Sequence, residues 1–277
     1  MSKPLCCLAL DVGNTTTRFA LFASDARERD EPLGTWELTT PESLTPDEAR
    51  MRLAQVLGVL AQDVARERGL SAERAASFAK PPLGAILSCV VPALTDAWAR
   101  ALAIACGTRP FVVGPGLKTS LKMRYNDPSE VGSDRIADAI ALRESYGAPA
   151  VAVDLGTTVN IEVVDADGAF AGGIIAPGLA LGARALAASA ARLPEIELRA
   201  PAAVVGKSTR EAIQSGVVLG EAARVDGLLS RVFAEMGAEA PAVVTGTGAL
   251  ELAALLEHQV TVDDTLTMRG LHHLYLM

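Results

Sequence analysis

Two short turns of the same kind constrain this 277-residue chain more than any other feature, because each joins an aspartate to a glycine at the end of an apolar run. The first reads Asp11-Val12-Gly13-Asn14-Thr15, and the second reads Asp154-Leu155-Gly156-Thr157, half a chain length further on. Glycine lets the backbone turn close to a ligand, and the threonine adds a hydroxyl and an N–H group. We therefore interpret both as phosphate-binding turns.

Strand-like stretches follow both turns, over residues 17–22 and 159–164. Each turn is therefore expected to join two antiparallel strands rather than to open a helix as a Walker loop does. A single Asp-x-Gly sequence is more often only a structural turn. Repetition at matching places in two halves instead indicates a duplicated fold, in which two hairpins facing one cleft would hold a nucleotide tail and its metal ion.

The composition fits two domains of ordinary size, since 50% of the residues are apolar and 21% are charged. The segment Gly114-Pro115-Gly116 is the best boundary in the chain. It predicts an N-terminal domain over residues 1–115 with the first turn and a C-terminal domain over residues 116–277 with the second. The order of expected strands and helices is typical of an α/β protein.

Periodicity and capping residues place the other elements. Thr45 and Glu48 form a capping-box pattern for a helix over residues 46–68. Further helices are expected over residues 95–106, 133–146, 179–192, 210–235 and 249–257, and further strands over residues 34–38, 84–91, 110–113 and 242–244.

Charge and hydropathy exclude two classes of partner. A net charge of −8 and a pI near 5.0 leave no broad basic surface, so we expect no nucleic acid. The apolar runs are shorter than the ~18 to 20 residues of a membrane span. Asp11 interrupts the first run, which indicates a strand and not a signal peptide. We expect a cytoplasmic protein that does not enter a membrane.

The cysteines and histidines lack the spacing of metal ligands. We expect the four cysteines, which include the adjacent pair Cys6 and Cys7, to be small buried hydrophobes in a reducing cytosol. We expect His258, His272 and His273 to lie at the surface.

Between the two turns, Gly132-Ser133-Asp134-Arg135 places a carboxylate and a guanidinium side by side at an expected helix start. Such an aspartate can hydrogen-bond a substrate hydroxyl, and such an arginine can bind a carboxylate or phosphate with two hydrogen bonds. The alternative, on local sequence alone, is a helix cap followed by a solvated arginine.

Taken together, the motifs identify a family. In order and spacing they resemble the type III pantothenate kinases over nearly the whole chain. The motifs are D-x-G-N-T at 11–15, G-x-D-R at 132–135, D-x-G-T at 154–157, G-G-x-I-x-P-G at 172–178 and G-K-S-T at 206–209. The resemblance implies a duplicated ribonuclease-H-like fold of the actin/hexokinase type, with two similar domains around a central cleft. It also implies a homodimer that phosphorylates pantothenate with ATP to 4'-phosphopantothenate, in the first step of coenzyme A biosynthesis.

The same resemblance assigns roles to individual residues. Asp134 would be the general base, and Asp154 would bind a monovalent cation, either potassium or ammonium. ATP would contact Asp11, Val12, Gly13, Asn14, Thr15, Thr16, Thr17, Arg18 and Thr157. Pantothenate would contact Tyr125, Gly132, Ser133, Asp134, Arg135 and Thr209.

Elementary chemistry agrees with these roles. A primary alcohol is a poor nucleophile, so a carboxylate near its proton helps to orient and deprotonate it during phosphoryl transfer. Arg135 or a neighbouring N–H could bind the carboxylate of pantothenate. A cation at Asp154, and Mg²⁺ on the nucleotide, would offset the negative charge of phosphates and aspartates in one cleft.

The sequence departs from the family pattern at two places. Residues 158–162 read Thr-Val-Asn-Ile-Glu, where the family usually has Ala-Thr-Thr and then an acidic residue, so Val159 lacks the usual hydroxyl. Arg18 stands where lysine is common, which keeps the charge and changes the geometry.

Two other functions stay open at this point. One is another kinase or a phosphohydrolase of the same fold, since the fold fixes the position of ATP and not the acceptor. The other is a regulatory relative without catalysis. For the homodimer, the alanine-rich helices with Asp226 and Gly227 are the candidate interface, whose alternative role is packing within the chain. Thr209 is expected to reach pantothenate in the other subunit.

Overall fold

The structure is a computed structural model that describes residues 6–23, 31–69, 71, 73, 83–114, 117, 119–190 and 193–277. Its contacts divide the chain into two compact units. The first comprises residues 1–122, 126–145 and 265–277, and the second comprises residues 123–125 and 146–264. Among the described residues, no helix is long and apolar enough to cross a membrane.

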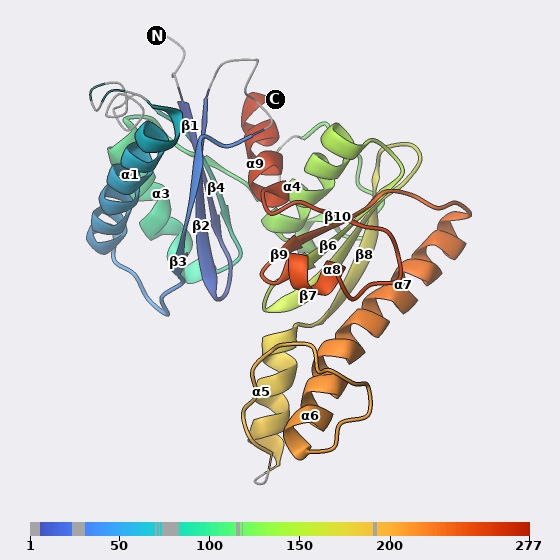
Figure 1. The fold of residues 1–277 in the computed structure, drawn as a ribbon. Coiled ribbons are helices and arrows are strands. Elements are labelled where there is room, and N and C mark those ends of the chain that lie inside the picture. The colour runs from blue at the N-terminus through green and yellow to red at the C-terminus, as the bar shows by residue number, and fades with distance from the viewer. Residues whose placement is uncertain are drawn as a thin grey trace. The chain divides into compact units, whose positions relative to one another are not determined.

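The first unit is built on a five-stranded sheet with the order β3-β2-β1-β4-β5 (Figure 1). Strand β2 is antiparallel to β1 and β3, whereas β4 and β5 run parallel to β1. The strands are β1 (Cys6–Val12), β2 (Thr16–Ala23), β3 (Gly34–Thr39), β4 (Gly84–Cys89) and β5 (Phe111–Val112).

The second unit repeats this topology, since its sheet has the order β10-β9-β6-β7-β8 with antiparallel β6-β7-β8 and parallel β6-β9-β10. The strands are β6 (Ala150–Leu155), β7 (Thr158–Val164), β8 (Phe170–Pro177), β9 (Ala242–Gly246) and β10 (Thr261–Val262). Read from β8 to β10, the strand order is that of the first sheet. The duplicated ribonuclease-H-like α/β fold expected from the sequence is confirmed.

Two helices cover one face of the first sheet, as Figure 1 shows. They are α1 (Pro46–Arg68) and α3 (Pro92–Cys106), and their apolar side chains form one core with those of β1, β2 and β4. The predicted bounds of α1 are confirmed. Thr45 and Glu48 form the expected capping box, and Gly69 ends the helix in the left-handed conformation with φ of 60°.

The cysteines lie as the sequence predicted, with Cys6, Cys7 and Cys106 buried and Cys89 half-buried. Burial raises the pKa of Cys6 to about 11 and that of Cys106 to about 12. Burial also raises the pKa of Cys7 well above its usual range, and the neighbouring Cys106 and Cys6 add to the rise. All three therefore stay thiols at neutral pH and act as small apolar groups.

The opposite face of the first sheet is covered by α9 (Leu266–Leu276), which packs on β1, β2 and β4 and against α4 (Ser133–Ala141). The two helices cross closely because Gly270 has no side chain, since a Cβ there would lie 1.9 Å from the carbonyl oxygen of Ala137. His272 is fully buried in α9, and its ring stacks on Phe22 with centroids 4.3 Å apart. The expected surface position of His272 is therefore wrong.

The sequence placed the domain boundary near residue 115, and Pro115 and Gly116 lie outside the described residues. The compact units do not divide the chain at one point, because residues 126–145 and 265–277 belong to the first unit. The physical reason is that α4 and α9 bury their apolar sides against each other and against the first sheet. A domain boundary predicted from the sequence alone cannot show that the C-terminal residues pack on the first unit.

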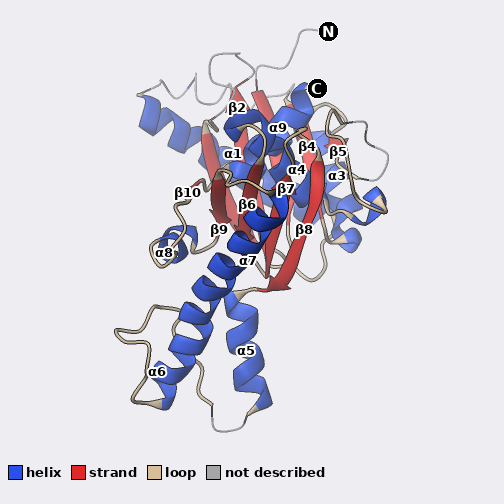
Figure 2. Ribbon diagram, turned by 90° about the vertical axis from the view of Figure 1, so that its right-hand side faces the viewer, coloured by secondary structure: helices blue, strands red, loops and turns tan. Residues whose placement is uncertain are grey.

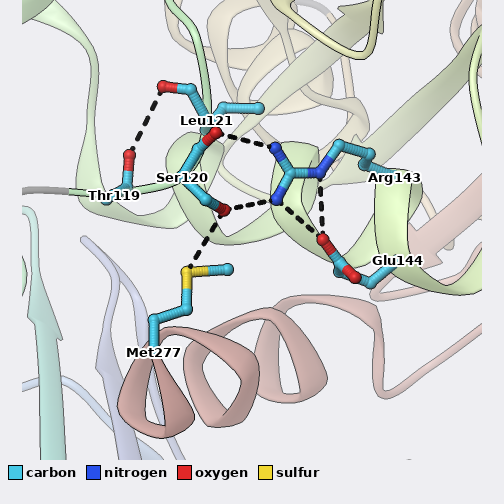
Figure 3. Close-up of polar contacts among 6 residues, drawn as sticks. All are labelled: Thr119, Ser120, Leu121, Arg143, Glu144 and Met277. Atoms are coloured by element: carbon cyan, nitrogen blue, oxygen red, sulfur yellow. Dashed lines mark hydrogen bonds and ion pairs between the residues drawn. The ribbon is translucent and has the colours of Figure 1, made fainter.

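Figure 3 shows a polar cluster that holds the segment leading out of the first unit. Arg143 lies in η3 (Leu142–Tyr146), a π-helical turn that continues α4. Its guanidinium donates to the carbonyl oxygen of Ser120 (3.1 Å) and to the Ser120 hydroxyl oxygen (2.6 Å), and it also pairs with Glu144. The Ser120 hydroxyl donates in turn to the sulfur of Met277 (3.4 Å).

The second unit contains a helical insertion between β8 and β9 that extends beyond its sheet (Figure 2). The insertion comprises α5 (Leu179–Ser189), α6 (Thr209–Gln214), the π-helical turn η4 (Ser215–Leu219) and α7 (Gly220–Met236). The predicted helix over 210–235 is thus present with a π-turn inside it. Residues 191 and 192 of the predicted first helix lie outside the described residues.

The remaining elements of the second unit are short. After β9, α8 (Ala249–Ala253) is shorter than the helix expected over 249–257, and Asp226 binds the chain that follows it. The Asp226 carboxylate accepts from the N–H groups of Glu257 (2.9 Å) and His258 (3.1 Å). This carboxylate, expected at a subunit interface, therefore makes contacts within its own chain.

Candidate active site

The first predicted turn is the tip of the hairpin formed by β1 and β2. The Gly13 N–H donates to the carbonyl oxygen of Thr16 (2.9 Å), so Asn14 and Thr15 remain exposed at the tip. Val12 is fully buried in the core and can contribute only its backbone. Successive backbone N–H groups in a tight, exposed turn suit an oxyanion, so the tip is suited to a phosphate.

Thr17 stabilises this turn from behind. The Thr40 hydroxyl donates to the carbonyl oxygen of Gly13 (2.8 Å) and lies 2.9 Å from the Thr17 hydroxyl. Because Thr40 has one proton and gives it to Gly13, Thr17 is the donor to Thr40. Thr17 is fully buried, so its hydroxyl fixes the turn. Arg18, which pairs with Glu37 at 3.2 Å, is the cationic side chain next to the turn.

A buried chain of hydroxyl groups connects Asp11 to the start of α4. The Ser88 hydroxyl donates to Asp11 Oδ1 (2.7 Å) and lies 2.8 Å from the Ser133 hydroxyl oxygen. Since Ser88 gives its proton to Asp11, Ser133 must donate to Ser88. All three side chains are buried, with 7% of Asp11, none of Ser88 and 7% of Ser133 exposed. We call this arrangement the hydroxyl chain.

Asp134 follows Ser133 in the first turn of α4. The N–H of Arg135 donates to Asp134 Oδ1 (2.8 Å), and a Cβ on Gly132 would lie 2.4 Å from that oxygen. Burial raises the pKa of the Asp134 carboxyl above its usual value, whereas the N–H and the positive charge of Arg135 oppose the rise. A carboxylate with a raised pKa is better suited to accept a proton near neutral pH.

The second predicted turn is the tip of the hairpin formed by β6 and β7. The Gly156 N–H donates to the carbonyl oxygen of Thr158 (2.9 Å), which leaves the half-exposed Thr157 alone at the tip. Gly178 packs directly against this tip, because a Cβ there would lie 2.4 Å from the carbonyl oxygen of Gly156. This contact explains the final glycine of the motif at 172–178.

Asp154 lies in a row of polar side chains across the second sheet. The register places Asn160 of β7 on one side of it and Thr245 of β9 on the other, and residues that pair directly share a face. Gly246, with φ of 88°, allows close approach, since a Cβ there would lie 2.6 Å from Asp154 Oδ1. The first sheet has the corresponding row of Arg18, Asp11 and Ser88.

The unusual Val159 lies in the core of the second unit. It is 2% exposed and packs in one cluster with Val225 of α7 and with Ile161. Side chains alternate across a strand, so Thr158 and Asn160 occupy the face of Asp154. Their side chains are hydrogen-bonded to each other, with Thr158 Oγ1 donating to Asn160 Oδ1 (3.1 Å). A hydroxyl at position 159 would point away from Asp154.

Tyr125 belongs to the second unit, whereas Gly132–Arg135 belong to the first. Its ring lies 5.9 Å from that of Phe170 and against Gly172, where φ of 127° requires glycine. The preceding Arg124 pairs with Asp165 (2.7 Å) and with Asp167 in the turn before β8. These contacts fix the backbone that carries Tyr125.

Thr209 is exposed at the first position of α6. The Ser208 hydroxyl caps the helix by accepting from the N–H of Glu211 (3.2 Å), and Glu211 accepts from the N–H of Lys207 (2.7 Å). Gly206 is required because a Cβ there would lie 2.4 Å from the Ala212 nitrogen. The G-K-S-T motif is therefore a helix start that leaves the threonine accessible.

Comparisons with known proteins identify the family. The profile of the family described as type III pantothenate kinase matches residues 7–231. A type III pantothenate kinase from Thermomicrobium roseum is 38% identical over 269 residues, which cover 97% of this chain and 96% of that protein. A type III pantothenate kinase from Moorella thermoacetica is 35% identical over 272 residues, which cover 97% of this chain and 98% of that protein. The chain belongs to the type III pantothenate kinase family.

A solved structure shares the fold. It is a Campylobacter jejuni protein of the Baf family, named as a transcriptional activator, with a TM-score of 0.55 and 18% identity over 96% of each chain. At this level of identity, the likeness to this Campylobacter jejuni protein concerns the fold and carries no information on activity.

Among the described residues, no group of three or more His, Cys, Asp or Glu side chains could hold a metal ion. Mg²⁺ in nucleotide sites does not need such a group, because it is commonly held by one or two carboxylates together with the phosphates of the nucleotide. Asp11 fits such a role by its chemistry, since it is a carboxylate on β1 next to the exposed turn between β1 and β2.

The structure thus gathers Asp11 and Gly132–Arg135 in the first unit of this kinase. Tyr125, Asp154, Thr157 and Thr209 belong to the second, where Thr209 lies in the helical insertion, apart from the sheet that carries Asp154. Two site neighbours were missed from the sequence, namely Ser88 and Asn160. The available signal was a polar residue inside a strand that is otherwise apolar, as in Gly84-Ala-Ile-Leu-Ser-Cys.

Proposed function

We propose that this chain transfers the γ-phosphoryl group of ATP to the primary hydroxyl of pantothenate, which gives 4'-phosphopantothenate for coenzyme A biosynthesis. Membership of the type III pantothenate kinase family supports this reaction. The observation that carries the catalytic part is the carboxylate of Asp134. It lies at the start of α4, has a raised pKa and is two residues from the glycine that leaves room for it.

In this proposal, Asp134 accepts the proton of the pantothenate hydroxyl as its oxygen attacks the γ-phosphorus and ADP departs. The hairpin tip with Asn14 and Thr15 binds phosphate oxygens, and Arg18 adds positive charge. Thr157 contacts ATP from the second hairpin. Mg²⁺ beside Asp11, when bound, neutralises charge that develops on the phosphate oxygens.

Pantothenate ends in a carboxylate, for which Arg135 and the N–H groups at the start of α4 are suitable partners. Ser133 gives its proton to Ser88, so its hydroxyl offers a ligand only lone pairs. The ring of Tyr125 offers an apolar wall and a hydroxyl. We assign Gly132, Ser133, Arg135, Tyr125 and Thr209 to pantothenate on these grounds and on the family motifs.

A monovalent cation, K⁺ or NH₄⁺, is proposed at Asp154. In the first sheet the residue paired with Asp11 is Arg18, whereas in the second sheet the residue paired with Asp154 is the neutral Asn160. A cation at Asp154 would supply in the second row the charge that arginine supplies in the first. Oxygen atoms of Thr245 and Asn160 are chemically suitable additional ligands.

A cytoplasmic homodimer is proposed, with the helical insertion of the second unit at the interface. The alanine-rich α5 and the segment before α6 expose apolar side chains, among which Val204 and Val205 are 73% and 79% exposed. An exposed apolar patch is typical of a protein interface. Thr209 begins α6 beside this segment, which favours its contribution to a site in the partner.

The reaction is tested by measuring ADP release from ATP with pantothenate, with a series of sugars, with acetate and without acceptor, each in potassium buffer. We expect ADP release to require pantothenate. Release with a sugar or acetate alone would instead identify another kinase of this fold, and release without an acceptor would identify a phosphohydrolase.

A further inference from the structure

Ser88 is a polar residue with no role in the family motifs, yet it occupies the middle of the hydroxyl chain. It lies near the end of β4, between the Asp11 carboxylate on β1 and the Ser133 hydroxyl on α4, at 2.7 and 2.8 Å. The side chain is fully buried, so no water competes for these bonds. Removal of the Ser88 hydroxyl would leave a donor on Ser133 and an acceptor on Asp11 buried without this partner.

The direction of the hydrogen bonds in the hydroxyl chain gives Ser88 a specific role. The proton of Ser133 goes to Ser88 and the proton of Ser88 goes to Asp11, so both hydroxyls are oriented by the negative charge of one carboxylate. Ser133 is the first residue of α4, and Asp134 is the second. A change in the position of Ser133 therefore moves the backbone from which the Asp134 carboxylate extends.

The second sheet places a hydroxyl at the corresponding position. Thr245 pairs with Asp154 in the parallel register of β9 and β6, just as Ser88 pairs with Asp11 in that of β4 and β1. Thr245 is 1% exposed. A hydroxyl beside the strand-end aspartate is thus repeated in both halves, and a threonine fits that place in one of them.

We propose that Ser88 is a positioning residue for phosphoryl transfer, which fixes the start of α4 relative to Asp11 and thereby aligns Asp134 with the nucleotide end of the site. This inference rests on the proposed function, because it takes Asp11 and Asp134 as groups of the kinase reaction. Ser88 itself touches no substrate in this role.

The test compares Ser88→Ala, Ser88→Cys and Ser88→Thr in the full-length protein. Alanine removes the hydroxyl, cysteine keeps a similar volume with a weak donor, and threonine keeps the hydroxyl. We expect kcat to fall by about 10- to 100-fold in the first two, since small misplacements of reacting groups have effects of that size. The KM for pantothenate should change much less, and Ser88→Thr should recover most of kcat.

Thr108→Ala is the matched control. The Thr108 hydroxyl donates to the carbonyl oxygen of Leu83 (2.6 Å), which immediately precedes β4 at the end opposite to Ser88. This variant removes one hydroxyl hydrogen bond next to the same strand. It should lose a comparable amount of thermal stability with kcat unchanged, which separates positioning from a general loss of stability.

A double-mutant cycle with Ser133→Ala completes the test. If the two hydroxyls act as one chain, the effect of Ser133→Ala on kcat should be several-fold smaller in the Ser88→Ala background than in the wild type. Folded Ser88→Ala and Ser88→Cys proteins with kcat within twofold of wild type, or strictly additive effects, would overturn the proposal. Wild-type protein inactive toward pantothenate would instead refute the proposed function.

Discussion

Gly132 leaves the space that the carboxylate of Asp134 occupies, since a Cβ at position 132 would lie 2.4 Å from Asp134 Oδ1. The backbone of Gly132 has φ of −58°, a value that alanine adopts without strain. The glycine of the G-x-D-R motif is therefore explained by the room it gives to the Asp134 carboxylate, and not by backbone conformation.

Gly132→Ala should consequently displace the Asp134 carboxylate while the fold is retained. We expect kcat to fall by about 100-fold, as for other small displacements of a catalytic group. Steady-state kinetics measure kcat, and circular dichroism checks that the fold is retained. Gly58→Ala is the control, because among the described residues the added Cβ in α1 meets no atom within 4 Å beyond its chain neighbours and the nearby backbone of its own helix. Equal activity of both variants would show that the carboxylate tolerates the methyl group.

Asp134→Asn tests the base itself. The amide keeps the shape but cannot accept the proton, so kcat should fall by roughly 100-fold or more. In the wild type, activity should decline as the pH falls through the raised pKa of Asp134, at a pH above the ~3.9 of an ordinary aspartate. A pH profile of kcat/KM that stays flat down to the usual aspartate range would contradict this.

The same substitution should stabilise the protein at neutral pH. A carboxyl whose pKa is raised by folding contributes stability below its unfolded pKa, and this contribution is lost as the pH rises through the folded pKa. Asparagine does not ionise, so the Asp134→Asn protein does not lose stability in this way as the pH rises. Thermal melts should therefore show a higher Tm for Asp134→Asn at about pH 8, with the difference shrinking toward pH 4. A lower Tm at pH 8 would indicate that burial of the charge is fully compensated.

The cation site is tested by exchanging salts at constant ionic strength. Dialysed enzyme should have little activity in sodium buffer and should recover activity with potassium or ammonium, because the site proposed at Asp154 is expected to bind the larger cations. Asp154→Ala should abolish the recovery, whereas Asp63→Ala, which removes a surface carboxylate on α1, should leave it unchanged. Equal activity of wild-type enzyme in all three salts would exclude a selective cation.

The ion pairs of Arg124, the residue before Tyr125, give a prediction for substrate affinity. Arg124 pairs with Asp165 and Asp167 and so fixes the segment that carries Tyr125. Arg124→Met should raise the KM for pantothenate by about fivefold, the effect of losing an exposed ion pair of ~1 kcal/mol, with little change in kcat. Arg100→Met, which breaks the exposed pair with Asp96, should leave that KM unchanged.

Local rules allowed much of the fold to be predicted, and long-range packing explains what they missed. The bounds of α1 follow from the capping box at Thr45 and the glycine at position 69, both of which act within a few residues. Helix α9 carries no comparable cap, since Thr265 makes no side-chain cap bond. Its burial depends on α4 and the first sheet, which are distant in sequence, so His272 could not be predicted as buried.

The same contrast between local sequence signals and long-range packing applies to the candidate site. The place of Asp11 and Asp154 near the ends of two strands, each before a hairpin turn, could be predicted because the motif repeats along the chain. Ser88 could not, because its role depends on a strand register that joins β4 to β1 and on the approach of α4. A lone serine in an apolar strand signals only that some partner is needed.

The last prediction concerns the proposed shared site, in which Thr209 of one subunit reaches the pantothenate bound at Gly132–Arg135 of the other. Thr209 is exposed at the start of α6, so Thr209→Trp should fold normally while blocking the site that it completes. Asp134→Asn and Thr209→Trp homodimers should each be inactive. A heterodimer of the two has one site that combines an intact Asp134 with an intact Thr209.

After subunit exchange in an equal mixture, half of the dimers are heterodimers with one working site each, so about a quarter of the wild-type activity should return. Exchange is verified by mass spectrometry of differently tagged subunits. If Thr209 acted within its own chain, every site in the heterodimer would carry one defect, and the mixture would stay as inactive as its parents. The activity of the exchanged mixture therefore distinguishes a site completed by the partner from one completed within each subunit.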